Sequence, residues 1–385
     1  MDVETFRALL TEEGQAALAA VRDRDPASWR ATLTGLRWDH SAELVSAAVE
    51  QDRLRREAVA KFGEYAHRMY FTRDGLERAS HLDVGAYKLD RLLHEIGVVF
   101  VDALPLGIGA EASVLGWSHV LAGADADPLN IAITAENSGV LGAMDNLALY
   151  HQDVMTYRPQ GEAVFVDLMR RGAPGVGVGV GVGVGVGVGV GVGVGVEAYA
   201  PSLPWALAVV REMGAGAVRL SPELAHQLLP DDSGADEAEW ISWNGDVQEA
   251  VLWFGLDGDR HPAAPVRRAT LLPGGASLTS RGLPEPAVRP AGRYLYEPDG
   301  AVVRAGLLAE LAEDVGGGLL DGGAPLITSD EPRTTAFATA YEITGVEPFD
   351  AGRSASGATE EEPVFLTRDA GDPALLARLR VRRTG

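Results

Sequence analysis

The chain has 385 residues and no cysteine, which excludes disulfides and thiolate metal sites. Its formal net charge of -22 opposes broad electrostatic binding to a phosphate backbone, so a nucleic-acid ligand would need a local basic patch. No stretch is typical of a membrane span, and the first residues lack the pattern of a secretory signal. We therefore expect a cytoplasmic protein with no membrane partner and no metal.

Residues 1–80 are predicted to form a helical region, because apolar residues recur in them at near-helical spacing. This region carries basic residues that could contact a nucleic acid, although a solvated helix face is the simpler interpretation: Arg53, Arg55, Arg56, Lys61 and Arg68. We expect Met69, Tyr70 and Phe71 in the core. Thr72 is expected to cap a short helix through Leu76.

The stretch from Val98 to Asp127 is the most informative part of the sequence. An apolar run ends in Asp102, a turn with Gly107 and Gly109 follows, and a short helical segment leads to a second apolar run. This order of strand, glycine turn, helix, strand and acid is typical of a nucleotide-binding βαβ unit. The glycines let the backbone approach a ligand closely, and an acid after the second strand can accept hydrogen bonds from a ribose.

Acidic residues follow four successive predicted strands. Asp102, Asp125, Asp153 and Asp167 lie at or near the ends of strands predicted around 98–101, 120–122, 149–153 and 163–167. The carboxyl ends of parallel strands share one edge of a sheet, which is where open α/β folds place their ligands. The four acids together therefore favour a nucleotide-type site over the alternative that each one only caps a helix.

Residues 81–275 are predicted to form one domain that contains a Gly-Val insertion at 175–196. Further strands are predicted at 217–220 and 239–243. The apolar runs 250–254 and 269–272 are expected to pair as a closing antiparallel hairpin.

Residues 276–385 differ in composition and are predicted to form a separate C-terminal domain. An aromatic strand and turn at 294–300 precede a helix predicted over 302–311. The segment 350–362 is polar and expected to be mobile. The terminal arginines could contact phosphate, although a loose solvated terminus is the commoner explanation: Arg378, Arg380, Arg382 and Arg383.

Several of these segments together resemble bacterial class I S-adenosylmethionine-dependent methyltransferases that carry a C-terminal THUMP-like domain. The resemblance covers the chain through about Phe349. It is carried by FTRDGLERAS (71–80), GIG (107–109), DADP (125–128), FVD (165–167) with RRG (170–172), EAVLWF (249–254) and GRYLYEPDGAVVRAG (292–306). The first and last of these runs are the most specific because of their length.

The resemblance implies an α/β fold with a Rossmann-like, mostly parallel sheet, N-terminal helices and a small C-terminal α+β domain. It also implies S-adenosylmethionine as cofactor and RNA as the methyl acceptor. The glycine turn would hold the methionine part of the cofactor, Asp125 its ribose and Asp153 its adenine. Asp102 and Glu111 complete the predicted cofactor site, while Asp167 and Arg170 would face the acceptor as catalytic residues.

The sequence departs from the family pattern at several positions. Ala103 stands where the family has an acid, and Asp102 lies one place earlier, on the opposite face of an extended strand. Leu168 and Met169 replace a Pro-Ala pair after Asp167. These departures favour one alternative, a catalytically impaired relative that still binds cofactor or a partner. A second alternative is a nicotinamide-dependent oxidoreductase that uses the same βαβ unit, although the incomplete glycine fingerprint and the strand-end acids argue against it.

Overall fold

The computed structural model describes the chain except residues 23–33, 37–38, 117–119, 171–198, 225, 230–231, 257–263, 322–323, 349–363, 369–375 and 385. Two compact units divide it: residues 1–169 with 204–218, and residues 170–203 with 219–385. The predicted Gly-Val insertion and the polar segment 350–362 therefore lie outside the described residues. Among the helices of the described chain, none combines the length and apolarity needed to cross a membrane.

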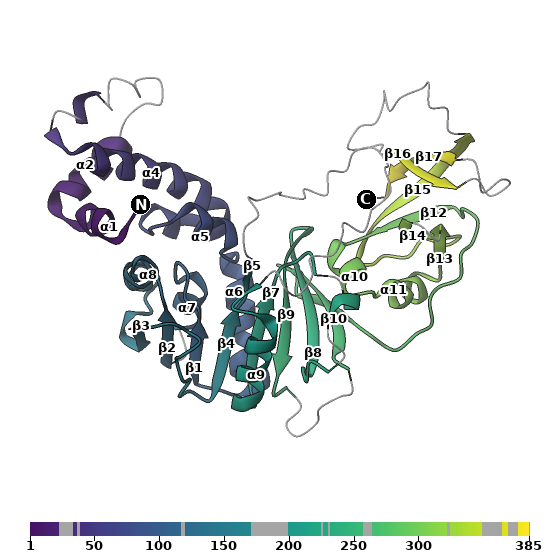
Figure 1. The fold of residues 1–385 in the computed structure, drawn as a ribbon. Helices are drawn as coiled ribbons and strands as arrows, with labels where there is room; N and C mark the ends of the chain where they lie inside the picture. Colours follow the sequence, from purple (N-terminus) through teal and green to yellow (C-terminus); the bar gives the residue numbers. More distant parts are fainter. Residues whose placement is uncertain are drawn as a thin grey trace. The chain divides into compact units, whose positions relative to one another are not determined.

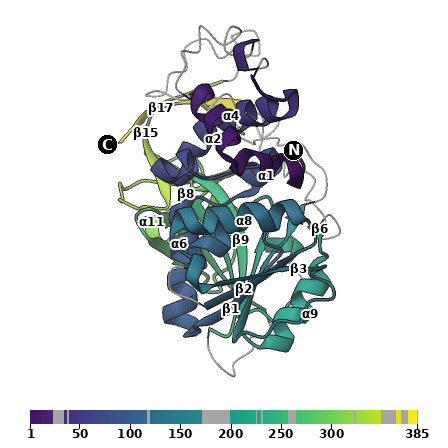
Figure 2. The same cartoon turned by 90° about the vertical axis from the view of Figure 1, so that its left-hand side faces the viewer.

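The first unit begins with helices, as predicted: α1 (Val3–Leu10), α2 (Glu12–Arg22), α4 (Ala42–Phe62) and the short 3-10 helix η2 (Gly63–His67). Asp2 caps α1 by accepting from the Thr5 amide, and Ser41 caps α4 by accepting from the Leu44 amide. These helices lie next to helix α8 (Pro128–Leu141), which is seen end-on in Figure 1 and along its length in Figure 2.

Helix α5 (Arg73–Arg78) confirms the predicted cap, because the Thr72 hydroxyl accepts from the Gly75 amide at 3.0 Å. Helix α6 (Leu82–Arg91) continues into a π-helical turn, η3 (Leu92–Ile96). Gly97 then adopts a left-handed conformation and ends the helical segment before the first strand.

The βαβ unit has the predicted order. Strand β1 (Phe100–Leu104) leads through the glycine turn to α7 (Ala110–Leu115), and β2 (Val120–Asp125) leads to α8. After the 3-10 helix η4 (Met144–Asn146) come β3 (Leu147–His151), β4 (Ala163–Asp167), α9 (Leu203–Met213) and β7 (Gly216–Leu220). Two short strands, β5 (Met169–Arg170) and β6 (Tyr199–Ala200), pair with each other.

The large sheet has the strand order β11-β10-β8-β9-β7-β4-β1-β2-β3. Strand β1 pairs in parallel with both β2 and β4, and β2 pairs in parallel with β3. The carboxyl ends of these strands, where Asp125 and Asp167 lie, therefore share one edge. The result is the mixed α/β fold with a mostly parallel sheet that the sequence predicted.

The prediction that the runs 250–254 and 269–272 pair as a closing hairpin is wrong. Strand β9 (Asp246–Phe254) pairs antiparallel with β8 (Glu237–Trp243), whereas β10 (Val266–Leu272) pairs in parallel with β8 and antiparallel with β11 (Ala276–Thr279). Strand β8 lies between the two runs that we expected to pair. The Asn244-Gly245 turn explains the difference, because both residues have positive φ and connect β8 to β9 as a tight hairpin.

A separate six-stranded sheet has the order β13-β14-β12-β15-β17-β16. Its strands are β12 (Tyr294–Pro298), β13 (Gly318–Asp321), β14 (Ala324–Ser329), β15 (Ala338–Pro348), β16 (Val364–Arg368) and β17 (Leu376–Arg383). The second unit also contains the short 3-10 helix η6 (His226–Leu228).

Two expectations for this C-terminal part are corrected. The predicted helix over 302–311 is two helices, α10 (Gly300–Arg304) and α11 (Leu308–Val315), because Gly306 has φ +66° and interrupts the helical path. The terminal arginines are part of β17 and not a loose terminus. Leu379 and Val381 bury their side chains and so hold the strand in the sheet.

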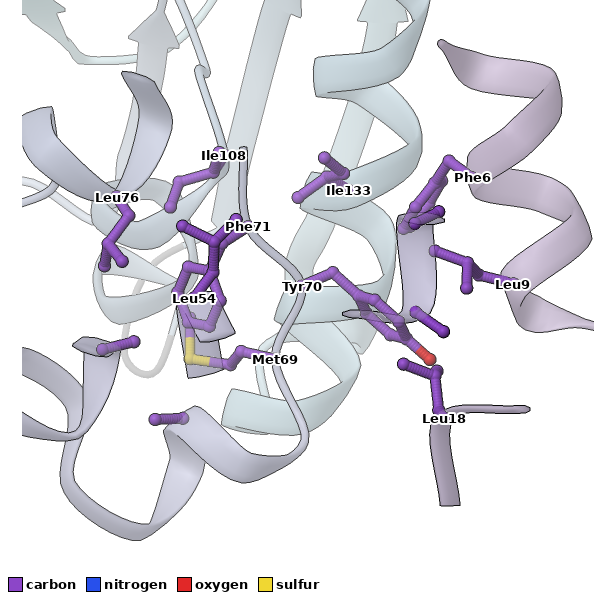
Figure 3. Close-up of a cluster of buried hydrophobic side chains, with 14 of the residues drawn as sticks. Phe6, Leu9, Leu18, Leu54, Met69, Tyr70, Phe71, Leu76, Ile108 and Ile133 are labelled. Atoms are coloured by element: carbon purple, nitrogen blue, oxygen red, sulfur yellow. The ribbon is translucent and has the colours of Figure 1, made fainter. Parts of the chain in front are cut away.

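The core of the first unit combines the N-terminal helices with α8 and the glycine turn. Met69 and Phe71 are fully buried and Tyr70 is 6% exposed, which confirms that they are core residues. Figure 3 shows these side chains among Phe6, Leu9, Ile108 and Ile133. The N-terminal helical region thus packs directly against the glycine turn of the βαβ unit.

Candidate functional site

Gly107 and Gly109 form the turn between β1 and α7, and both have positive φ, of 56° and 72°. A side chain at Gly109 would overlap Thr134, whose Cα would lie 2.8 Å from the added Cβ. A Cβ at Gly107 would meet nothing within 4 Å. Gly109 is therefore needed for packing against α8, whereas Gly107 leaves open space beside the turn.

Asp125, at the end of β2, binds this turn directly. Its Oδ2 accepts from the Gly107 amide at 3.0 Å and from the Asn130 side chain at 3.2 Å, while Oδ1 accepts from the Asp127 amide at 2.8 Å. Burial, which leaves the residue 6% exposed, raises the pKa of Asp125, although these hydrogen bonds act in the opposite direction. The carboxylate thus joins the ends of β1 and β2.

Glu111 lies in the first turn of α7 and is 8% exposed. Its Oε1 accepts from Lys88 Nζ at 2.7 Å, and Lys88 is itself fully buried on α6. Its Oε2 has no hydrogen-bond partner among the described residues. A buried carboxylate oxygen that lacks a donor is costly, so this atom is suited to receive a donor from a ligand.

Asp102 lies apart from this arrangement. It is fully buried, and its carboxylate accepts from the Tyr157 hydroxyl at 2.6 Å and from the Gln160 and Gly161 amides at 2.9 and 2.6 Å. These bonds hold the loop before β4, and burial together with the Asp102 carboxylate raises the pKa of Tyr157. Asp102 therefore has a structural role that the strand-end pattern did not reveal.

The remaining predicted residues lie at or beyond the ends of β3 and β4. Asp153 is exposed, and its Oδ1 accepts from the Met155 amide at 2.9 Å; the preceding residue, Gln152, donates its amide to the Asp125 carbonyl. Asp167 is the half-buried last residue of β4. Arg170 lies in β5, but its side chain is outside the described part of the chain, so its role stays a prediction.

Sequence reasoning missed a set of buried polar residues that surround the turn. Asn137 on α8 is fully buried, and its Nδ2 donates to the Ile108 carbonyl at 2.9 Å. Lys88 and Ser80, which hydrogen-bond each other at 3.2 Å, are also buried. The available signal was weak: Thr134, Asn137 and Ser138 are polar residues that recur on one face of a largely apolar helix.

Comparisons with known proteins identify sequence relatives and a protein of similar fold. An uncharacterised S-adenosylmethionine-dependent methyltransferase of Mycobacterium tuberculosis, found in strains H37Rv and CDC 1551, is 30% identical over 267 residues, which cover 68% of this chain and 67% of the relative. A crystal structure of a proposed methyltransferase from Porphyromonas gingivalis W83 covers 100% of both chains with a TM-score of 0.69 and 17% identity. Residues 2–58 match a family described as a domain of unknown function, DUF8688.

The fold and the site define the class of Rossmann-like α/β proteins that bind a nucleotide-type ligand at the carboxyl edge of the sheet. Because the mycobacterial relative is 30% identical in sequence over two thirds of both chains, the class can be narrowed to one family. The chain belongs to the S-adenosylmethionine-dependent methyltransferases. The comparisons do not support the oxidoreductase alternative.

The residues present fit S-adenosylmethionine. A carboxylate offers about four acceptor positions, of which Asp125 uses three for the protein, so one remains for a ribose hydroxyl. The buried Oε2 of Glu111 is an acceptor suited to the ammonium group of the methionine part. The open space beside Gly107 allows the backbone to approach the ligand.

Proposed function

We propose that this methyltransferase acts on RNA and that its C-terminal domain corresponds to a THUMP-like domain. The observation that carries the cofactor site is the bond between Asp125 and the Gly107 amide, which joins the acid after β2 to the glycine turn. We assign the cofactor to Gly107, Gly109, Glu111, Asp125 and Asp153, and leave out Asp102, whose carboxylate serves the protein. We also propose that the protein works in the cytoplasm.

The chemistry requires alignment more than a reactive protein group. When bound, S-adenosylmethionine supplies a methyl group on a positively charged sulfur, which is transferred by in-line displacement. The chain's task is to hold the acceptor in line with that methyl group and to provide a preorganised polar environment. We assign Asp167 to orient the acceptor and to remove its proton, and Arg170 to bind a neighbouring phosphate.

The RNA acceptor is supported by the family resemblance and by the surface of β17. Alternation along this strand buries Leu379 and Val381 and exposes Arg380 and Arg382. Arg382 pairs with Glu342 on β15 at 2.7 Å, which orders its guanidinium at the surface. A local basic strand of this kind is what a chain with a net charge of -22 needs in order to meet a phosphate backbone.

A methyl-transfer assay tests the proposal. The protein is incubated with labelled S-adenosylmethionine and, separately, with bulk RNA, a protein extract or small-molecule acceptors. We expect label in RNA, and we expect Asp167→Asn to lower the transfer rate at least 100-fold, the scale of lost general-base catalysis, while S-adenosylhomocysteine still binds.

The control variant is Asp145→Asn, which changes an exposed carboxylate near β3 and should transfer methyl groups like the wild type. Label in the protein or small-molecule fraction alone would contradict the RNA acceptor. Cofactor binding without transfer to any fraction would favour the catalytically impaired relative.

A further inference from the structure

The segment Met69–Phe71 passes between the N-terminal helices and the methyltransferase core, and two buried amide side chains hold its backbone. Asn137, on α8, holds Tyr70, and Gln51, on α4, holds Phe71. Both amides are at most 1% exposed. Figure 3 shows Phe71 near Ile108 of the glycine turn, and Tyr70 on the side of Phe6 and Leu9.

Asn137 bonds to two different parts of the chain at once. Its Oδ1 accepts from the Tyr70 amide at 2.8 Å, and its Nδ2 donates to the Tyr70 carbonyl at 3.0 Å and to the Ile108 carbonyl at 2.9 Å. Ile108 lies between Gly107 and Gly109, so this side chain links the glycine turn directly to the Met69–Phe71 segment. Both donor hydrogens and the acceptor oxygen of the amide are used.

The same helix holds the turn at neighbouring points. Thr134 donates to the Gly107 carbonyl at 3.4 Å, and Ser138 shares a hydrogen bond with Ser113 of α7 at 3.0 Å. Residues 134, 137 and 138 share one face of a helix, so α8 presents a buried polar stripe to the turn and to α7. Within this stripe, Asn137 bonds to both the turn and the segment at Tyr70.

Gln51 carries the same side-chain amide, and among the described residues its hydrogen bonds go to the segment. Its Nε2 donates to the Phe71 carbonyl at 2.6 Å, and its Oε1 accepts from the Phe71 amide at 3.0 Å. From the same helix, Arg55 donates to the Met69 carbonyl, and Lys61 donates to the carbonyls of Leu76, Glu77 and Ala79 at the end of α5. Helix α4 therefore holds residues 69–79 by side-chain bonds to their backbone.

We propose that Asn137 is a positioning residue, through which docking of the N-terminal helical region sets the conformation of the glycine turn and thereby the affinity for the cofactor. The inference rests on the cofactor site proposed above, and it gives a role to the region matched by the domain of unknown function, which contains Gln51. Because coupling between sites is reciprocal, cofactor binding must in turn stabilise the Met69–Phe71 segment.

Titration of S-adenosylhomocysteine into the full chain tests the proposal with a matched pair of variants. Asn137→Ala and Gln51→Ala each remove a buried amide that holds the same segment, so both should lower the melting temperature. We expect Asn137→Ala to weaken binding about tenfold, because the Ile108 carbonyl loses its donor. Gln51→Ala should weaken binding by a smaller factor, about threefold, because it loosens the docked segment but leaves the bond to Ile108 in place. Wild-type affinity in either variant would overturn the proposal.

Hydrogen exchange of the wild-type protein provides a test that does not depend on the variants folding. The Tyr70 and Phe71 amides should exchange more slowly when S-adenosylhomocysteine is added. Protection confined to residues 100–167 would contradict the coupling. Neither experiment measures methyl transfer, so an error in the proposed RNA acceptor would leave these results unchanged, and an absence of binding to the wild type would contradict the cofactor site itself.

Discussion

Gly107 and Gly109 lie two residues apart in the same turn, yet the structure gives an added side chain very different room at each. Both have left-handed backbones, which cost a non-glycine residue about 1–2 kcal/mol. At Gly109 a Cβ would also overlap the backbone of Thr134, whereas at Gly107 it would enter open space. Gly109 therefore serves packing, and the proposed cofactor site assigns the open space beside Gly107 to the ligand.

This difference predicts opposite effects of the two alanine variants. Gly109→Ala should lower the melting temperature more than Gly107→Ala, because it adds a clash to the backbone strain. Gly107→Ala should weaken S-adenosylhomocysteine binding at least tenfold with a smaller loss of stability, because its methyl group occupies the space left for the ligand. Thermal unfolding and calorimetric titration measure the two quantities, and wild-type affinity in Gly107→Ala would show that the ligand lies elsewhere.

At the scale of elements, the end of α10 shows how side chains from two distant elements, the 3-10 helix η6 and strand β10, define a helix boundary. His226 hydrogen-bonds through Nδ1 to the Arg304 carbonyl at 3.0 Å, and Arg267 donates to the carbonyls of Ala305 and Gly306. These groups satisfy carbonyls that the helix leaves without partners where it ends. Burial lowers the pKa of His226 below its ordinary value, with the positive charge of Arg267 acting in the same direction.

A pH dependence of stability follows from that direction. The unfolded chain protonates His226 near its ordinary pKa of about 6.5, whereas the folded protein keeps the imidazole neutral to lower pH. The contribution of His226 to the free energy of unfolding is therefore fully present above pH 6.5 and is lost as the pH falls towards the folded pKa. Between pH 7 and pH 5 the wild type should therefore lose more free energy of unfolding than His226→Gln. Urea unfolding at several pH values measures this, and parallel curves for the two proteins would contradict it.

At the scale of the whole molecule, the net charge of -22 repels a phosphate backbone, whereas the exposed arginines of β17 attract it. Such binding releases counterions, so RNA affinity should fall steeply with salt concentration. The slope of log affinity against log salt should decrease by about one for each arginine removed from the contact.

The double variant Arg380→Gln, Arg383→Gln tests this expectation on the full chain. We expect weaker RNA binding and a salt slope smaller by about two, because two phosphate contacts are lost. Arg53→Gln is the matched control, since Arg53 is exposed on α4 and pairs with Glu50 at 2.8 Å. Filter binding at a series of salt concentrations measures the slopes, and equal slopes for the two variants would place the RNA contact away from β17.

The sequence predicted the elements well where local signals were strong. Strand β4 has the predicted limits, Ala163–Asp167, and Thr72 caps α5 as expected. The sequence-based prediction failed where strand pairing joins distant residues. Strand β8 lies between the runs at 250–254 and 269–272, and no local sequence pattern determines which strands are neighbours in the sheet. The prediction also placed Arg55 and Lys61 among surface cations, although both donate to backbone carbonyls of the segment 69–79.

The order of strand, glycine turn, helix and acid, and with it the class of fold, was determined by the sequence itself, because glycine conformation and apolar periodicity act within a few residues. Only the tertiary structure decided which acids face the turn: Asp125 bonds to Gly107, while Asp102, predicted at a strand end, is the buried middle residue of β1 and holds the loop at Tyr157. The physical reason is that a carboxylate's role depends on its donors, and the donors of Asp102 lie more than 50 residues further along the chain.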